Sequence, residues 1–276
     1  MVLEKAGLKF INAWVKASEK SLLTTKPMKV NIEGLRYAPS LEGDVINFST
    51  PKIKLDEEIF NFLPWRSRGY RKLPPTGKPP EYTAEAKEAT ERFVEKGWIE
   101  EPLPNGFRIG FGPYRFDNNG CLKSGGEMLY YNKKSNGLDI MAKRLQNIYA
   151  ENPKITEEQK AEILYKFVNN CYDRGRADWT DKFANDFIPI ENTAASGAGV
   201  CRHKSFLAKV LGDRLGLHVA MARGRYITVP ELEIGESHIW NEIKVKDKWF
   251  LMDVEQERFI DLAEFPEFSK LYEYAH

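Results

Sequence analysis

Two runs of alternating residues in the last quarter of the chain constrain its fold most tightly. They cover residues 238–245 and 249–254, and a short polar Lys-Asp pair between them suits a tight turn. The length of such a turn fixes which residues of two antiparallel strands face each other. A two-residue turn puts Asp253 opposite Trp240, one diagonal step from His238 on the same sheet face. We therefore expect an antiparallel sheet that holds an imidazole and a carboxylate within reach of each other.

Upstream of this hairpin, a strongly patterned helix is expected to begin at a cysteine. Cys201 follows the glycine-rich run 196–200, and Gly216 stands where the helix should end. The apolar stripe of this helix consists of Phe206, Leu207, Val210, Leu211 and Leu215. A thiol in the first turn of a helix lies near unpaired backbone N–H groups and the positive end of the dipole, which favour the thiolate. The basic residues 202–204 add positive charge, so we predict that Cys201 is a reactive nucleophile.

The other cysteines are interpreted as structural. Three cysteines are too few for a disulfide framework or a four-cysteine zinc site, and an odd number leaves at least one thiol unpaired. Cys121 stands beside an Asn-Asn-Gly turn signal, and Cys171 falls on the apolar face of a predicted helix. A buried core role is the alternative for Cys201. Metal binding through Cys201 and His203 is a weaker alternative, because further ligands at suitable spacing are missing.

A nucleophilic cysteine needs a base, and the chain has four histidines, one of them its last residue. His203 is two positions from Cys201 on the same helix, so its side chain should point away from the thiol. His218 follows the helix end and is expected on a strand surface. His238 is therefore the predicted base, with Asp253 to orient its ring. The sequence predicts a Cys201–His238–Asp253 catalytic set, with the nucleophile at a helix start and its partners on adjacent strands.

These motifs, in this order, resemble the core of the transglutaminase-like superfamily. The matching pieces are Gly199-Val-Cys201, the helix that ends in Leu-Gly, His238-Ile-Trp240-Asn-Glu and Trp-Phe-Leu-Met-Asp253. The sequence Cys-Arg-His-Lys at residues 201–204 is similar to that of the transglutaminase-like domain of a group of plant kinases. The resemblance covers residues 155–256. It implies an α+β, papain-like fold, in which a helix bearing the cysteine packs on an antiparallel sheet bearing the histidine and aspartate.

The resemblance also implies a reaction. Cys201 would attack an amide or ester carbonyl, His238 would move the proton, and water or an amine would resolve the thioester. The backbone N–H of Cys201 would hold the oxyanion, together with a second donor for which Trp179 and Asn192 are candidates. Binding of the substrate is expected to involve Trp240 and Gly199.

Hydrolysis of an amide bond in a peptide or protein is the first expectation, as in a peptidase, amidase or deamidase. Two alternatives stay open. One is a transglutaminase that forms amide crosslinks, and the other is a protein-binding module of the same fold that has no activity. No metal or cofactor is expected, because the chain has neither a calcium loop nor a phosphate-binding loop.

The sequence divides into an N-terminal region, residues 1–140, and a transglutaminase-like domain, residues 141–276. The features expected in the first region are an amphipathic helix over 1–21, short strands between 29 and 62, a proline-rich basic loop over 64–82, a helix over 83–98 with Thr83 as N-cap, and a β-meander over 106–131. In the second region, Thr156 and Gln159 have the spacing of a capping box at the start of a helix.

Composition narrows the class of partner. The 276 residues include 41 Lys and Arg against 40 Asp and Glu, for a formal net charge of +1. This balance argues against a protein that coats nucleic acid, so a peptide or protein substrate is the expected partner. The sequence has no signal-peptide pattern and no apolar run of membrane-spanning length, so a cytoplasmic location is expected. The oligomeric state is left open.

Overall fold

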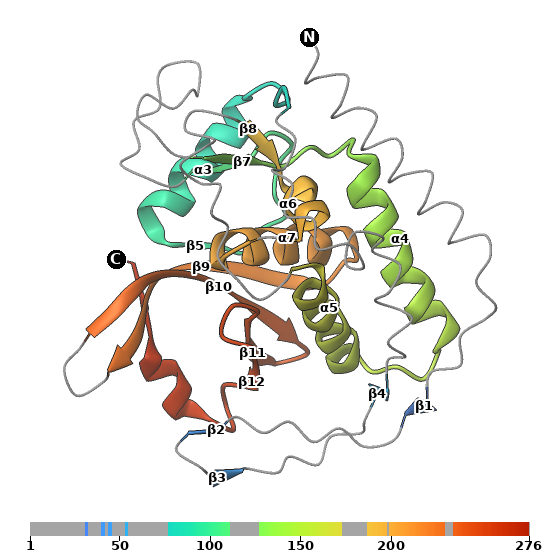
Figure 1. Cartoon of the computed structure of the whole chain (residues 1–276), viewed down its shortest axis with the longest axis vertical. Helices are drawn as coiled ribbons and strands as arrows, with labels where there is room; N and C mark the ends of the chain where they lie inside the picture. The colour runs from blue at the N-terminus through green and yellow to red at the C-terminus, as the bar shows by residue number, and fades with distance from the viewer. Residues whose placement is uncertain are drawn as a thin grey trace.

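The computed structural model describes residues 77–110, 127–172, 187–197, 199–229 and 234–275, together with four two-residue strands nearer the N-terminus (Figure 1). Among these short strands, β1 (Asn31–Ile32) pairs with β4 (Ile53–Lys54) and β2 (Ser40–Leu41) pairs with β3 (Asp44–Val45), both antiparallel. The amphipathic helix expected over 1–21, most of the basic loop over 64–82, Cys121 and Trp179 lie outside the described residues.

A six-stranded antiparallel sheet forms the centre of the molecule. Its order is β12–β11–β10–β9–β13, and β5 also pairs with β9. The strands are β5 (Trp98–Ile99), β9 (His218–Val229), β10 (Ile234–Val245), β11 (Lys248–Asp253), β12 (Arg258–Asp261) and β13 (Tyr272–Tyr274). A 3-10 helix, η4 (Pro266–Leu271), leads into β13. The last strand of the chain thus returns to the edge of β9.

The predicted hairpin register is confirmed. Asn241 of β10 faces Met252 of β11, and Lys246-Asp247 form the turn, so Asp253 falls beside Trp240 as expected. The prediction that β10 begins at His238 is wrong, because the strand begins at Ile234, four residues earlier. Its first residues, Ile-Gly-Glu-Ser, do not alternate in a recognisable way, yet they pair with the long strand β9. His238 therefore lies inside a strand rather than at its start.

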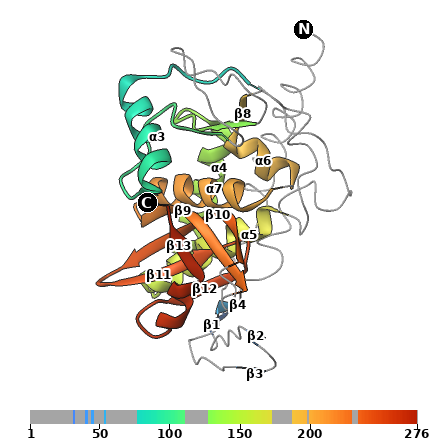
Figure 2. The same ribbon diagram turned by 90° about the vertical axis from the view of Figure 1, so that its left-hand side faces the viewer.

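The described part of the chain contains five α-helices. They are α3 (Ala84–Lys96), α4 (Asn136–Glu151), α5 (Glu157–Cys171), α6 (Ile190–Ser196) and α7 (Cys201–Arg214). α7 packs against β9 and β10 and also contacts α5 and α6, as Figures 1 and 2 show from two sides. Because side chains alternate along a strand, residues such as Met221 and Ile243 join the large core under the helices, whereas Trp240 joins a second cluster on the other face. The second cluster also contains Leu251, Ile260, Phe268 and Tyr272.

The local signals at the ends of the helices are confirmed. Thr83 Oγ1 accepts a hydrogen bond from the Ala86 N–H at 3.2 Å at the start of α3. At the start of α5, Thr156 and Gln159 form the predicted capping box, with distances of 3.2 and 3.0 Å. Gly216 follows the end of α7 with a φ of 70°, a left-handed conformation that glycine adopts without strain. Such signals are local, because each depends on residues within one helical turn.

A smaller sheet lies beside the main one. β6 (Arg108–Gly110) pairs antiparallel with β7 (Met128–Tyr130), within the range expected for the β-meander. β8 (Phe187–Pro189) adds a parallel strand on the other side of β7, which the sequence did not predict. The division expected after residue 140 falls inside α4, and one core holds residues from both sides, including Phe107 against Phe206 with ring centres 5.6 Å apart. The fold class is α+β, as predicted.

Candidate active site

Cys201 is the first residue of α7 and is partly exposed to solvent. Val200 before it is extended, so the chain turns into the helix at the cysteine itself. This is the helix-start position that the sequence predicts. At the first position of a helix the backbone N–H has no partner within the helix. Thiol and N–H therefore stand at the same helix end.

His238 links this cysteine to Asp253. Its Nε2 lies 2.6 Å from Asp253 Oδ2, and the Cys201 thiol is near enough to contribute to the raised pKa of the ring. Because Nε2 is engaged by the carboxylate, Nδ1 is the ring nitrogen left for the thiol. The structure thus brings all three predicted residues together, from α7, β10 and β11.

Asp253 is fully buried and accepts four hydrogen bonds. Its Oδ1 accepts the backbone N–H groups of Glu255 and Gln256 at 3.0 and 3.1 Å. Its Oδ2 accepts from Tyr272 Oη at 2.8 Å as well as from His238. Burial alone would raise the pKa of Asp253, but the charge and hydrogen bond of His238, with the other donors, hold it below its usual value. Asp253 is therefore a carboxylate over the neutral range.

The pKa of His238 moves in the opposite direction. Burial favours the neutral ring, but the charge and hydrogen bond of Asp253, helped by Cys201, raise the pKa to about 10. The ring also lies among aromatic side chains, with Trp240 stacked at 6.1 Å and Tyr226 at 5.7 Å between centres. At neutral pH the site therefore holds an imidazolium that is paired with a carboxylate and lies near the Cys201 sulfur.

The charge expected from residues 202–204 is compensated. Arg202 forms an ion pair with Glu127, and Lys204 forms one with Glu255 at 2.8 Å. His203 is fully buried, and burial lowers its pKa below the usual value. The sequence shows the basic residues but not the carboxylates that reach them from other parts of the chain. Arg202 and Lys204 therefore have carboxylate partners of their own.

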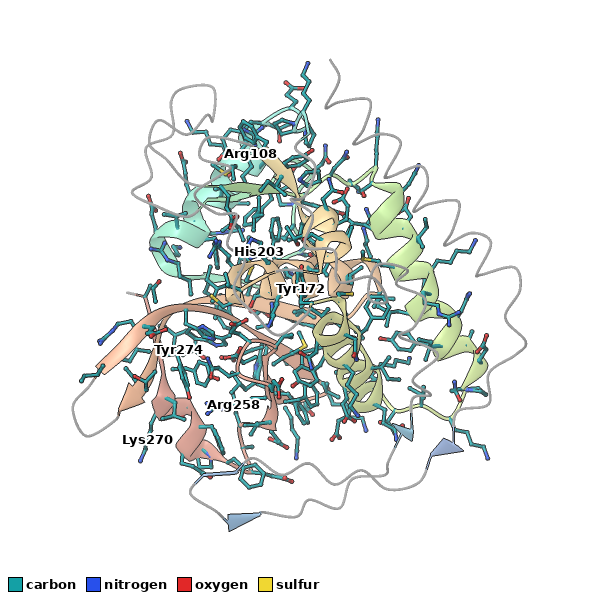
Figure 3. The ribbon with its side chains drawn as sticks, in the orientation of Figure 1. Arg108, Tyr172, His203, Arg258, Lys270 and Tyr274 are labelled. Carbon is teal, nitrogen blue, oxygen red and sulfur yellow. The ribbon has the colours of Figure 1, made fainter. Side chains whose placement is uncertain are left out.

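The buried His203 fixes the entry of the chain into α7. Its Nδ1 accepts the Val200 backbone N–H at 3.0 Å, so its proton is on Nε2, which lies 2.8 Å from Glu127 Oε1. Burial would raise the pKa of Glu127, but its contacts with His203 and Arg202 lower it. Figure 3 labels His203 and Tyr172, and Tyr172 Oη donates to the His203 carbonyl at 3.3 Å. No motif or spacing points to Glu127, which is separated from Arg202 by 75 positions.

Trp240 and Gly199 are both buried. Trp240 is fully buried, and a side chain at Gly199 would put a Cβ 2.5 Å from the Tyr172 ring. Their part in substrate binding stays a prediction. Asn192 is buried in α6, which packs on α7, and its part in an oxyanion hole stays a prediction.

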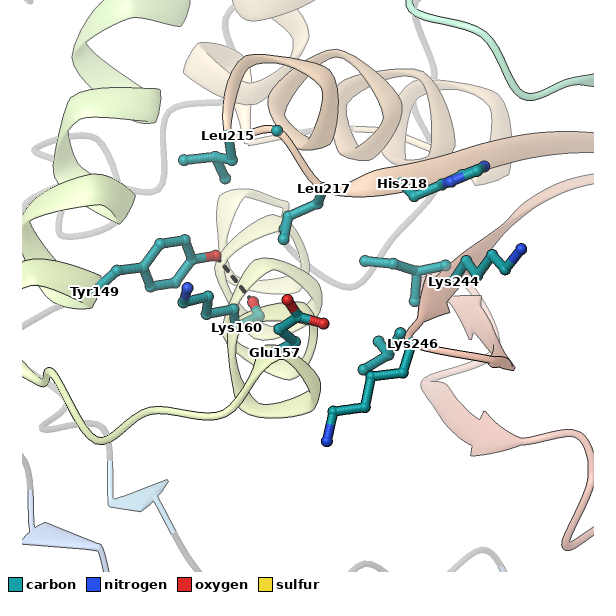
Figure 4. Close-up of a pocket in the computed structure, with 11 residues that line it drawn as sticks. Tyr149, Glu157, Lys160, Leu215, Leu217, His218, Lys244 and Lys246 are labelled. Atoms are coloured by element: carbon teal, nitrogen blue, oxygen red, sulfur yellow. Dashed lines mark hydrogen bonds between the residues drawn. The ribbon is translucent and has the colours of Figure 1, made fainter.

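A separate hollow of about 440 Å³ lies at the opposite end of α7 (Figure 4). Leu215 and Gly216 line it together with His218 and residues of β10, and Lys160 faces it from α5. Across the described ranges, no cluster of three His, Cys, Asp or Glu could hold a metal ion, and no helix is both long and apolar enough to cross a membrane.

The region that contains these residues is similar to a known protein family. Residues 144–254, which include all three predicted residues, match the family model of the transglutaminase-like superfamily. The fold is thus α+β, with a core that is similar to that of the transglutaminase-like superfamily. The crystal structure of a candidate cysteine protease from Cytophaga hutchinsonii is similar at 14% identity and a TM-score of 0.31. That alignment covers 47% of each chain, so it spans about half the length of that protein. Comparison with curated proteins gives no match.

Proposed function

We propose that this chain is a cysteine-dependent enzyme that hydrolyses an amide bond of a peptide or protein. Cys201 is the nucleophile, His238 transfers the proton and Asp253 orients His238. The observation that carries the proposal is the position of the His238 ring, with Nε2 2.6 Å from Asp253 Oδ2 and the Cys201 thiol near enough to contribute to its raised pKa. A nucleophile, a base and an orienting acid next to one another form the arrangement that thiol acyl transfer requires.

The first half of the reaction transfers the acyl group to sulfur. The Cys201 thiolate adds to the amide carbonyl carbon, and the carbonyl oxygen becomes an oxyanion near the Cys201 backbone N–H. The C–N bond then breaks as the His238 imidazolium gives its proton to the leaving nitrogen. The products are a free amine, a thioester on Cys201 and a neutral imidazole.

Water completes the cycle. Neutral His238 takes a proton from a water molecule as its oxygen adds to the thioester carbonyl. The C–S bond then breaks, which releases a carboxylic acid and restores the thiolate–imidazolium pair. An amine in place of water would give transamidation instead. Asp253 stays ionised throughout and holds the ring with Nδ1 toward sulfur.

The test uses an ester that needs no specific recognition. 4-Nitrophenyl acetate should release nitrophenolate and leave an acetyl thioester on the Cys201 peptide, detected by mass spectrometry after an acid quench. Cys201→Ala should lose the thioester, whereas Cys171→Ala, which removes a fully buried thiol, should keep it. An unchanged acetyl adduct in Cys201→Ala would exclude Cys201 as the nucleophile.

The same protein can be tested for transfer to an amine. A biotinylated pentylamine offered with a casein acceptor would be incorporated by a transglutaminase but not by a hydrolase. Hydrolysis of an amide bond in casein without incorporation of the biotinylated amine supports the proposed function. Capture of a peptide without any turnover in either assay would favour the binding module of the same fold.

A further inference from the structure

Strand β13 brings a tyrosine onto the His238–Asp253 pair from near the end of the chain. β13 pairs with β9, and Tyr272 lies beside Tyr226 in that register. Tyr272 Oη donates to Asp253 Oδ2 at 2.8 Å, the oxygen that also accepts from His238. Its ring centre is 6.2 Å from the His238 ring and 5.0 Å from that of Trp240. One side chain therefore contacts both members of the pair.

We propose that Tyr272 is a positioning residue that locks the Asp253 carboxylate toward His238 with its hydroxyl and shields the pair from water with its ring. This inference rests on the proposed function, because the pair it holds is the one that would serve Cys201. The hydroxyl and the ring do different work and can be separated by substitution. The tyrosine itself need not touch a substrate.

The direction of the hydroxyl is set by Arg258 of β12. Arg258 Nη1 donates to Tyr272 Oη at 3.4 Å, and Nη2 donates to Tyr226 Oη at 2.8 Å. A guanidinium has donors only, so the phenol oxygen accepts from it and its own proton is free for Asp253. Arg258 is itself held over the rings of Tyr226 and Phe268, at 5.1 and 5.4 Å. The arginine, the phenol and the carboxylate thus form a chain of donors that ends on Asp253.

Shielding follows from burial. The exposed fraction is 5% for His238, 5% for Tyr272 and zero for Asp253. Charges attract more strongly where water is absent, because the effective dielectric constant is lower. Removing the ring would admit water beside the pair and weaken that attraction. Among the described residues, the groups facing the pair are the Cys201 thiol of α7, Tyr226 of β9, Arg258 of β12 and Tyr272 of β13, with the Lys204–Glu255 ion pair just beyond.

The approach of β13 depends on a glycine. Gly224 lies directly opposite His238 in β9 and faces Tyr274 of β13. A side chain at Gly224 would overlap the Glu273 carbonyl oxygen. The strand can therefore come close enough for Tyr272 to reach Asp253 only because this position has no Cβ.

The experiment follows the titration of His238 by NMR, with Tyr272→Phe, Tyr272→Ala and the control Tyr274→Phe. The control removes a phenol from the same strand, but one that donates to Glu242 instead of Asp253. The ion pair has an acid limit, where Asp253 takes up a proton, and an alkaline limit, where His238 loses one. Tyr272→Phe removes a donor from Asp253, so the acid limit should move to higher pH while the alkaline limit stays near 10. Tyr272→Ala should also lower the alkaline limit by about one pH unit or more, toward 6.5. Tyr274→Phe should leave both limits unchanged.

The outcomes separate this inference from the proposed function, because the titration needs no turnover. Unchanged limits in Tyr272→Phe and Tyr272→Ala, in variants that keep the wild-type circular dichroism, would overturn the role of Tyr272 even if the ester assay succeeds. Shifted limits in a protein without acyl transfer would support the positioning role and count against the enzyme. If Tyr272→Ala does not fold, Tyr272→Phe alone decides, since it keeps the ring and loses only the hydroxyl.

Discussion

Besides His203 and Glu127, two histidine–carboxylate pairs stand at opposite ends of α7, and their surroundings differ sharply. His238 and Asp253 lie near its first residue, with side chains 6% and 1% exposed. His218 and Glu100 lie near its end, beside the hollow, with side chains 44% and 40% exposed. The same two functional groups are in contact in each case. Only the first pair is buried, saturated with further donors and next to a thiol.

The difference shows why we do not take the hollow near His218 as the candidate active site. At the first pair, donors from β10, β13 and the turn after β11 converge on one carboxylate, and this fixes its orientation. At the second pair, both groups are free to exchange their contact for water, and exposed ion pairs of this kind contribute little to stability. The hollow near His218 offers space for a ligand, but it does not hold a reactive group in place. The hydrogen bonds that converge on Asp253 do hold such a group.

The largest expected difference between the pairs is in reaction rate. His238→Ala should lower the rate of ester turnover by about 100- to 10,000-fold, because a positioned proton-transfer group contributes that much. His218→Ala should leave the rate within about twofold, since an exposed surface pair contributes little. Initial rates with 4-nitrophenyl acetate measure both. A similar loss in the two variants would mean that neither histidine is the base.

The second contrast is in stability. Asp253→Asn keeps the shape of the side chain but leaves a buried imidazole without its carboxylate, which should cost about 3–5 kcal/mol. Glu100→Gln breaks the exposed pair and should cost about 0–1 kcal/mol. Urea unfolding followed by circular dichroism gives both values. Equal changes in the free energy of unfolding would show that burial does not distinguish the pairs.

What the sequence predicts well is local. The register of β10 and β11 follows from a two-residue turn, and Thr83, Thr156 and Gly216 mark helix ends through neighbours in the chain. These signals were sufficient to bring His238 beside Asp253 and to put a cysteine at the start of a helix. They fail at the start of β10, where pairing with β9 rather than alternation of the residues defines the strand.

What the sequence could not predict depends on residues far apart in the chain. Glu127 neutralises Arg202 across 75 positions, and Tyr272 reaches Asp253 only because β13 returns to the edge of β9. Neither contact has a periodicity or a spacing that could be recognised. The sequence shows the basic residues next to Cys201. It does not show the carboxylates of Glu127 and Glu255, which the fold brings into contact with Arg202 and Lys204.

The pH dependence sharpens the comparison further. The folded pKa of His238 is about 10, above its unfolded value of 6.5, so its stabilisation is complete below pH 6.5 and is lost as the pH rises through about 10. The pKa of Asp253 is lowered, so its contribution is present above 3.8 and is lost as the pH falls below that value. The wild-type free energy of unfolding minus that of His238→Gln should therefore decrease by a few kcal/mol between pH 6.5 and 10. A difference that stays flat over this range would contradict a stable imidazolium–carboxylate pair, and His218→Gln provides the exposed reference.

The smallest expected contrast between paired substitutions comes from the glycines near the two ends of α7. Gly199→Ala should cost about 1–3 kcal/mol, because its Cβ would lie 2.5 Å from the Tyr172 ring in a packed region. Gly216→Ala has open space around it but keeps a φ of 70°, so it should cost about 1 kcal/mol through backbone strain alone. Thermal unfolding measures both, and iodoacetamide alkylation of Cys201 distinguishes them further. Gly199→Ala should slow alkylation, because the backbone that enters α7 must shift, while Gly216→Ala should not. If both variants alkylate at the wild-type rate, the packing at Gly199 supports the fold without positioning the thiol.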